Sequence, residues 1–234
     1  MKVLELFAGT RSIGKAFEAR GHEVFSVDWS KDFQNIDLYA DISALSAQDV
    51  LFCFGRPDVI WASPDCTTYS LAAISHHRER LADGTLAPKT EYARFCDACN
   101  AHVIDLIREL APRLFFIENP RGGLCRMDFM RGIPKHLVTY CQYGDTRMKP
   151  THIFTNCPEP GFKFCERGAP CHEAAPRGSR TGTQGIEGKA ARAVIPPALC
   201  EYIVDLCERK AWGKTAKHSG IETPSPRDSM DAGR

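Results

Sequence analysis

The chain has 234 residues, a net charge of +1, 43% hydrophobic side chains and 25% charged ones. These proportions are those of a folded globular protein and exclude a chain that is disordered throughout. No apolar run reaches the roughly 18 residues that a membrane-spanning helix needs, and the first residues do not resemble a secretory signal. Eleven cysteines without such a signal indicate thiols kept in the reduced state. We therefore expect a cytoplasmic protein without a membrane partner.

Charge is unevenly distributed along the chain. Acidic side chains outnumber basic ones in residues 1–112, whereas residues 113–192 carry a basic excess. An acidic first half does not favour contact with a polyanion, but a basic middle segment could face the phosphates of a nucleic acid. A solvated surface explains the same excess, so charge alone favours nucleic-acid binding only slightly.

Short apolar runs alternate with helical patterns through the first half of the chain. Near-continuous apolar strands separated by helices predict an α/β fold, with a mostly parallel sheet covered by helices on both faces. Residues 71–89 are predicted as a mobile loop, and 137–141 with 152–155 as a closing antiparallel pair. The other predicted strands are 3–7, 23–28, 36–41, 58–62 and 114–118, and the predicted helices are 13–20 and 92–110.

The composition changes at residue 156. Residues 1–155 hold the predicted sheet, whereas 156–192 are rich in Cys, Pro and Gly and have few aliphatic side chains. Helical spacing returns in 193–213, which we expect to complete the first domain. Residues 214–234 have the polar composition of a disordered tail. The chain is thus expected to be one domain with a small Cys-rich insertion.

Polar residues follow the first three predicted strands, where open α/β sheets bind their ligands. Gly9 and Gly14 remove side chains from the first turn, so that the backbone could approach a ligand closely. Asp28 is positioned to accept from ribose hydroxyls, Trp29 to cover an adenine and Asp41 to accept from an exocyclic amine. Because the first turn lacks GxGxxG, a nucleoside without a pyrophosphate fits better than a dinucleotide. Taken singly, each acid could instead be an ordinary helix cap.

Two further strand ends carry reactive side chains. Cys66 follows Ser-Pro-Asp at the end of an apolar strand and precedes Thr-Thr-Tyr-Ser. A lone cysteine is most often a buried apolar residue, but this polar environment favours a nucleophilic thiolate. Glu118 ends the strand at 114–118 and could donate a proton. Asn119 follows it directly.

The order of these motifs resembles the C5-cytosine DNA methyltransferase family, and in particular its short phage and prophage members. The resemblance covers roughly residues 3–156 and, more weakly, 193–208. It depends on the motifs Leu6-Phe7-Ala8-Gly9, Cys66-Thr67-Thr68-Tyr69-Ser70, Glu118-Asn119, Tyr143-Gly144 and Arg147-Met148-Lys149.

The resemblance implies a Rossmann-like fold dependent on S-adenosylmethionine, in a bacterial or phage-infected cell. Cys66 would add to C6 of a cytosine flipped out of duplex DNA, while Glu118 holds a proton at N3. Asn119 would orient the Glu118 loop, and Arg147 and Lys149 would complete the catalytic site. The protein would act as a monomer, with residues 1–155 as its catalytic and cofactor-binding domain.

The same resemblance implies a cofactor site. S-adenosylmethionine would lie over the turn after the first strand. Asp28 would meet its ribose and Trp29 its adenine, with Asp41 at the amino group. The remaining residues assigned to this site are Phe7, Ala8, Gly9 and Ile42.

The chain departs from the family pattern around the nucleophile and in the Arg-Lys motif. The family usually has Pro before the cysteine and Gln after it, whereas Asp65 and Thr67 stand here. A carboxylate beside the thiol should raise the thiol pKa and slow its attack. The family's Gln-x-Arg-x-Arg becomes Arg-Met-Lys-Pro-Thr at 147–151, which displaces one cation and removes another.

The insertion at 156–192 takes the place of the family's long target-recognition domain. It is too short for an apolar core of its own, so a zinc ion could substitute for one. Adjacent ligands are awkward for a tetrahedron, and the alternative is a loop with incidental thiols that orders only on DNA. Arg177 and Arg180 could follow phosphates, or simply be solvated. The zinc ligands would be Cys157, Cys165, Cys171 and His172.

Two other functions fit the same sequence. One is C5 methylation of cytosine in RNA, because one related branch modifies tRNA and also lacks a large recognition domain. The other is a catalytically silent DNA-binding protein that kept the fold.

Overall fold

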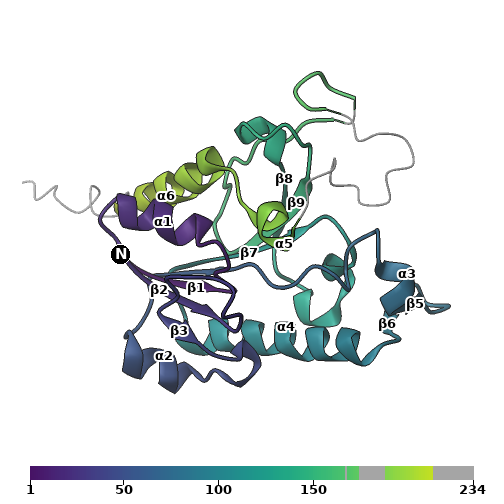
Figure 1. Cartoon of the computed structure of the whole chain (residues 1–234), viewed down its shortest axis with the longest axis horizontal. Coiled ribbons are helices and arrows are strands. Elements are labelled where there is room, and N and C mark those ends of the chain that lie inside the picture. Colours follow the sequence, from purple (N-terminus) through teal and green to yellow (C-terminus); the bar gives the residue numbers. More distant parts are fainter. Residues whose placement is uncertain (167, 174–187, 213–234) are drawn as a thin grey trace, which may run out of the picture.

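The computed structural model describes residues 1–166, 168–173 and 188–212 (Figure 1). Its centre is a seven-stranded sheet in the order β3-β2-β1-β4-β7-β9-β8. The first five of these strands are parallel, while β9 runs antiparallel to both β7 and β8. The predicted parallel sheet and its closing antiparallel pair are therefore confirmed. The strands are β1 Lys2–Leu6, β2 Glu23–Asp28, β3 Leu38–Tyr39, β4 Val59–Ala62, β7 Leu114–Pro120, β8 Lys135–Thr139 and β9 Pro150–Thr155.

Helices cover both faces of the sheet, as the sequence predicts. In Figure 1, α1 and α6 lie above the sheet and α2 and α4 below it. The α-helices are α1 Ser12–Ala19, α2 Ala47–Cys53, α3 Ile74–His77, α4 Glu91–Leu110, α5 Lys189–Ala193 and α6 Pro197–Trp212. The 3-10 turns are η1 Ile42–Ala44, η2 Gly123–Arg126, η3 Asp128–Met130 and η4 Tyr140–Tyr143.

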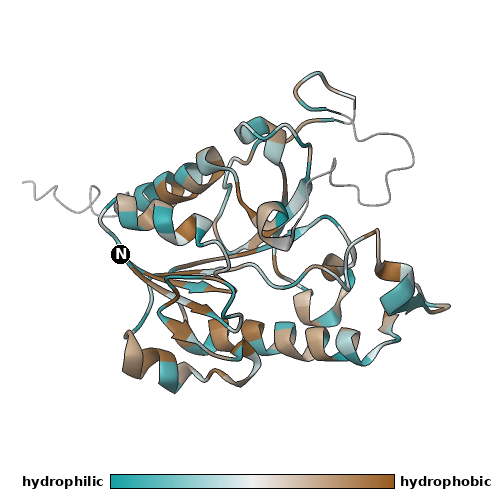
Figure 2. Ribbon diagram, in the orientation of Figure 1, coloured by the Kyte–Doolittle hydropathy of each residue, from teal (hydrophilic) through white to brown (hydrophobic). Residues whose placement is uncertain are grey.

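Alternate residues of each central strand point to opposite faces and build two separate cores. In β4, Trp61 packs with α1 and α6, whereas Ile60 packs with α2 and α4. In β7, Phe116 and Ile117 divide in the same way. Figure 2 shows the result as brown, apolar strands between helices of mixed hydropathy. Burial on both faces explains why these strands are apolar along their length.

Residues 71–89 contain regular structure rather than a loop alone. The helix α3 leads into a two-stranded antiparallel hairpin of β5 (Arg78–Arg80) and β6 (Leu86–Pro88). The backbone N–H of Lys89 donates to the carbonyl of His77 over 2.8 Å and closes the base of the hairpin. The prediction of a loop was wrong because the many charges of this segment hide two short strands.

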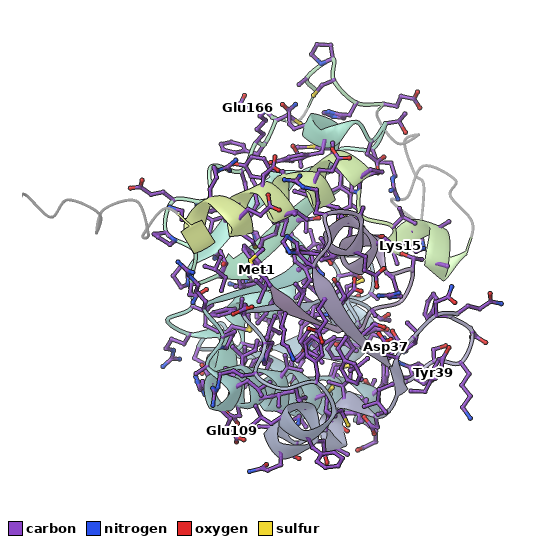
Figure 3. The ribbon with its side chains drawn as sticks, turned by 90° about the vertical axis from the view of Figure 1, so that its left-hand side faces the viewer. Met1, Lys15, Asp37, Tyr39, Glu109 and Glu166 are labelled. Atoms are coloured by element: carbon purple, nitrogen blue, oxygen red, sulfur yellow. The ribbon has the colours of Figure 1, made fainter. Side chains whose placement is uncertain are left out.

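After β9 ends at Thr155, the following segment is hydrogen-bonded to the end of β8. The N–H of Thr139 donates to the carbonyl of Lys163 over 3.3 Å, and the N–H of Lys163 donates to the hydroxyl of Tyr143 over 3.0 Å. Cys157 is 2% exposed and packs with α6. Figure 3, turned by 90°, places Glu166 of this segment and Glu109 of α4 at opposite ends of the molecule. The predicted tail at 214–234 lies outside the described residues, as does most of 174–192.

None of the helices in the described part of the chain is long and apolar enough to cross a membrane.

A buried carboxyl group joins β1 to α1. Glu5 is 2% exposed, and one of its oxygens accepts from the N–H of Gly14 over 3.0 Å. A Cβ at Gly14 would lie 2.4 Å from the other oxygen. The absence of a side chain at Gly14 therefore makes room for Glu5, and the expectation that it admits a ligand is corrected. Burial raises the pKa of Glu5 to about 7, although the nearby Arg11 guanidinium opposes this shift.

Stability should report the burial of Glu5. The folded state keeps the Glu5 proton between the ordinary pKa of 4.5 and the raised value of about 7, so the free energy of unfolding should fall as pH rises through this window. We expect Glu5→Gln to gain roughly 2–4 kcal/mol relative to the wild type between pH 4.5 and pH 8. Urea unfolding at several pH values measures this difference. The exposed Glu23→Gln is the control, and a difference for Glu5→Gln that does not change with pH would refute the account.

Candidate active site

The turn after β1 is held open by a carboxylate at the end of β2. Phe7 and Gly9 have left-handed backbone conformations, with φ of 54° and 50°. One oxygen of Asp28 accepts from the N–H of Gly9 over 2.9 Å, and the other accepts from the N–H of Ser30 over 2.8 Å. The N–H of Ala8 donates to the carbonyl of Val27 over 3.1 Å. Asp28, itself 4% exposed, therefore fixes the shape of this turn.

The other residues predicted for a cofactor lie beside this turn. Trp29 follows Asp28 directly and leaves 71% of its surface exposed, so its ring face is free to be covered. Asp41 caps η1 and accepts from the N–H of Ser43 over 2.9 Å. Ile42 is buried in the core beneath the turn. Because β1, β2 and β3 are parallel neighbours, these residues share one edge of the sheet.

The loops after β4 and β7 are tied to each other. The side-chain amide of Asn119 donates to the carbonyl of Pro64 over 3.0 Å, two residues before Cys66. The N–H of Gly123 donates to the carbonyl of Tyr69 over 2.7 Å. A Cβ at Gly122 would lie 2.3 Å from the same carbonyl oxygen, so this close approach requires glycine. The Cys66 loop and the Glu118 loop thus form one rigid unit.

Sequence reasoning missed the network that holds the residues after Cys66. Arg78, 3% exposed, donates to the carbonyl of Thr68 over 2.9 Å and to both oxygens of Asp97. Its guanidinium also covers the ring of Tyr69, whose hydroxyl donates to Asp97 over 2.7 Å. Asn100 donates to the same hydroxyl. Arg78 lies in the segment predicted as a loop, so nothing in the sequence pattern marked it as buried.

Glu118 lies in a cluster with a buried tyrosine and a half-buried lysine. The hydroxyl of Tyr140 donates to Glu118 over 3.0 Å, and both residues are buried. The Lys149 ammonium lies 4.3 Å from the centre of the Tyr140 ring and donates to the carbonyl of Arg192 over 3.0 Å. Burial lowers the pKa of Lys149, while the charge of Glu118 opposes this shift. Tyr140, which no motif indicated, is the direct hydrogen-bond partner of Glu118.

The Cys66 thiol is partly buried and faces more negative than positive charge. Burial, followed by the charges of Glu118 and Asp65, raises its pKa to about 11. Lys149 opposes it. The expected effect of Asp65 on the thiol is therefore present. Cys66, Glu118 and Lys149 are close enough to influence one another electrostatically.

Arg147 takes a different position from Lys149. Arg147 is 9% exposed, and its guanidinium forms a two-pronged ion pair with Asp145, including a contact of 2.9 Å from Nε. Its charge is thus neutralised locally, whereas Lys149 reaches the Glu118 cluster. The predicted phosphate contacts Arg177 and Arg180 lie outside the described residues.

The proposed zinc ligands do not all come together. Cys165, Cys171 and His172 gather around Cys141, and the four ligand atoms lie within 4.8 Å of one another. Cys157 is instead buried against α6 and is corrected to a core residue. Cys141 was missed because it precedes the Cys-rich segment by fifteen residues and lies in η4.

Comparison with known proteins gives one full-length relative. It is the "Probable DNA (cytosine-5)-methyltransferase" of Frog virus 3 (isolate Goorha), 28% identical over 224 residues that cover 88% of this chain and 100% of the relative. The resemblance to the C5-cytosine DNA methyltransferases is confirmed. No protein-family model matches the chain.

Solved structures give weaker likenesses to methyltransferases. The Entamoeba histolytica methyltransferase EhMeth has a TM-score of 0.48 and 12% identity, over 66% of this chain and 52% of that one. The S. pombe Dnmt2 methyltransferase has a TM-score of 0.45 and 14% identity, over 66% and 48%. This chain thus spans about half the length of those two proteins.

The departure from the methyltransferase pattern at Asp65 can be tested on the thiol itself. Asp65→Asn removes an exposed negative charge next to Cys66, so the thiol pKa should fall from about 11. The thiolate fraction at neutral pH should then rise, and we expect Cys66 to be alkylated roughly 2–10-fold faster. Rates come from iodoacetamide labelling followed by peptide mapping.

Asp83→Asn supplies the matched control for this measurement. Asp65 and Asp83 are both exposed and each accepts from the backbone N–H two residues later, in Thr67 and Thr85. Only the change at Asp65 should alter the reactivity of Cys66. Equal labelling rates for both variants and the wild type would show that Asp65 does not influence the thiol.

Proposed function

We propose that this protein transfers a methyl group from S-adenosylmethionine to C5 of cytosine in DNA. The observation that carries the proposal is the pairing of a thiol and a buried carboxyl group at neighbouring strand ends. Cys66 and Glu118 belong to loops joined by the hydrogen bond between Asn119 and Pro64. The Frog virus 3 relative supports the proposal, because its name states DNA (cytosine-5)-methyltransferase activity and the match covers its whole length.

The turn after β1 fits the nucleoside part of S-adenosylmethionine. Gly9 presents backbone without a side chain, and Asp28 keeps a second lone pair on each oxygen for ribose hydroxyls. Trp29 offers an exposed aromatic face to an adenine. Phe7 and Ala8 line the turn, with Asp41 and Ile42 at its far side. When bound, the cofactor supplies the methyl group as an electrophile.

Cys66 would act as the nucleophile. Its thiolate would add to C6 of the cytosine and so make C5 nucleophilic, and the methyl group would pass to C5 with S-adenosylhomocysteine as the leaving group. Loss of the C5 proton then restores the C5–C6 double bond and releases the thiolate. Glu118 would hold a proton at N3 during the addition, and Tyr140 fixes this carboxyl group from behind. Asn119 would hold the Cys66 loop and the Glu118 loop in fixed relative positions.

Lys149 would supply the positive charge that the altered motif retains. Its ammonium opposes the high pKa of Cys66 and lies over Tyr140. Arg147, paired with Asp145, would shape the loop rather than touch the base. A thiol whose pKa is about 11 holds its proton in the free protein. Attack on cytosine therefore requires proton removal or added positive charge when the substrate binds.

The substrate would be duplex DNA. A cytosine must leave the base stack to reach a thiol at the edge of the sheet. Residues 156–192 would contact the target, with Arg177 and Arg180 along the phosphates, while 1–155 and 193–213 form the catalytic part of a monomer. Methylation of RNA, or DNA binding without catalysis, are the competing outcomes of the experiment below.

Covalent trapping tests the function and its nucleophile together. Because the target sequence is unknown, we would use long duplex DNA and RNA in which every cytosine is 5-fluorocytosine. Fluorine at C5 cannot leave as a proton, so a covalent adduct with DNA should accumulate when S-adenosylmethionine is present. Adduct on RNA alone would assign the activity to RNA, and no adduct on either would support a silent protein.

Variants identify the groups responsible for the adduct. Cys66→Ser should abolish it, because a serine hydroxyl is a far weaker nucleophile at neutral pH. Glu118→Gln should slow it by roughly 10²–10⁴-fold if it donates a proton at N3. Cys53→Ser changes an exposed cysteine on α2 and should leave trapping intact. Peptide mapping of the cross-link to another cysteine would overturn the mechanism.

Calorimetry with S-adenosylmethionine tests the cofactor site. Asp28→Ala and Asp41→Ala should each weaken binding by about 1–3 kcal/mol, because each variant lacks a carboxylate that would accept a hydrogen bond from the ligand. Asp32→Ala, an exposed acid between β2 and β3, should bind normally. Since Asp28 also holds the turn, thermal unfolding without cofactor shows whether its variant remains folded. Unchanged affinity in both variants would remove the site from this edge of the sheet.

A further inference from the structure

A second cluster of reactive side chains lies outside the candidate active site. It consists of Cys141, in η4, together with Cys165, Cys171 and His172 from the segment that follows β9. The residues that contribute are separated by up to 31 positions in sequence, so only the fold brings them together. The cluster shares no residue with the catalytic or cofactor assignments above.

Three distances within the cluster match the edges of a metal tetrahedron. With Zn–S bonds of about 2.3 Å and Zn–N bonds of about 2.0–2.1 Å, two sulfurs lie about 3.8 Å apart and a sulfur and a nitrogen about 3.6 Å apart. The sulfurs of Cys141 and Cys171 are 3.8 Å apart. Nδ1 of His172 lies 3.6 Å from the sulfur of Cys165 and 3.6 Å from that of Cys171.

The separation of the Cys141 and Cys165 sulfurs bears on the choice between a metal and a disulfide. The sulfurs of Cys141 and Cys165 are 3.1 Å apart, well beyond the roughly 2.05 Å of a disulfide bond. A metal would require this distance to lengthen by about 0.7 Å to reach the tetrahedral edge. His172 points its nitrogen at both neighbouring sulfurs, although a disulfide would have no use for an imidazole. Adjacency of Cys171 and His172 in sequence is thus compatible with shared coordination.

The backbone around the cluster is held in place by hydrogen bonds. The N–H of Cys165 donates to the hydroxyl of Thr139 over 2.8 Å, and the amide of Gln142 donates to the sulfur of Cys171 over 3.3 Å. Donors to sulfur stabilise the thiolate form that binds metals. Such surrounding bonds are typical of a site whose ligands are oriented before the metal binds.

We propose that Cys141, Cys165, Cys171 and His172 bind one structural zinc ion. Three thiolates and one imidazole form a closed four-ligand set, which leaves no open position for a substrate. The ion would close a loop of chain from η4 to Cys171 that contains β9 and Lys149. It would therefore fasten the start of the Cys-rich segment to the part of the sheet that presents Tyr140 to Glu118.

Metal analysis of the full chain tests the proposal without using activity. Protein purified under reducing conditions should contain about one zinc per chain by elemental analysis and native mass spectrometry. Replacement by Co²⁺ should give the intense visible absorption of a tetrahedral cobalt–thiolate site. Cys171→Ser and His172→Ala should each lose most of the zinc. Cys53→Ser, which alters an exposed cysteine far from the cluster, should keep the full amount.

A ligand exchange guards against variants that merely unfold. Cys171 is exposed, so its replacement disturbs little packing. Cys171→His should retain a metal and change the cobalt spectrum, because one sulfur ligand becomes nitrogen. A wild-type chain that takes up no metal when zinc is supplied would overturn the proposal. A Cys171→Ser variant with an unchanged zinc content would also overturn it. So would a Cys141–Cys165 disulfide trapped in cells by thiol alkylation.

Discussion

The hydrogen bond from Asn119 to the carbonyl of Pro64 is the contact on which the candidate active site depends. It joins the ends of β4 and β7, two neighbouring parallel strands that are far apart in sequence. The short contact of Gly123 with Tyr69 repeats the connection a few residues farther out. Without these contacts, the loop with the thiol and the strand end with the carboxyl group could move independently. With them, both groups keep one relative position.

The placement of Cys66 near Glu118 disfavours the charged thiolate, and Lys149 reduces this effect. Bringing Cys66 near Glu118 and Asp65, in a partly buried place, disfavours the thiolate. Lys149 offsets part of this effect, although its own burial lowers its pKa. The site of the free protein is therefore balanced toward a neutral thiol. This balance would protect the thiol from side reactions until a substrate changes the local charge.

The turn η4, which directly follows β8, connects the active site to the Cys-rich segment. Tyr140 donates to Glu118 and is followed directly by Cys141, the first member of the Cys3His cluster. A segment this short cannot bury enough apolar surface to fold by itself. Its described residues are attached instead by the hydrogen bonds of Lys163 and Cys165 with Thr139 of β8 and by packing of Cys157 against α6. The turn η4 thus contributes neighbouring residues to both the active site and the cysteine cluster.

The sequence alone determined the alternation of apolar strands and helices, and with it the parallel sheet and the polar strand ends at Asp28, Cys66 and Glu118. These features are local, because the hydropathy pattern of a strand or a helix depends only on residues that are close together in sequence. It did not determine which distant side chains meet. Arg78 belongs to a segment whose charges are typical of a loop, and Cys141 lies outside the Cys-rich segment. Only tertiary contacts bury the first and bring the second to Cys171, because burial and ligand geometry depend on the packing of elements remote in sequence.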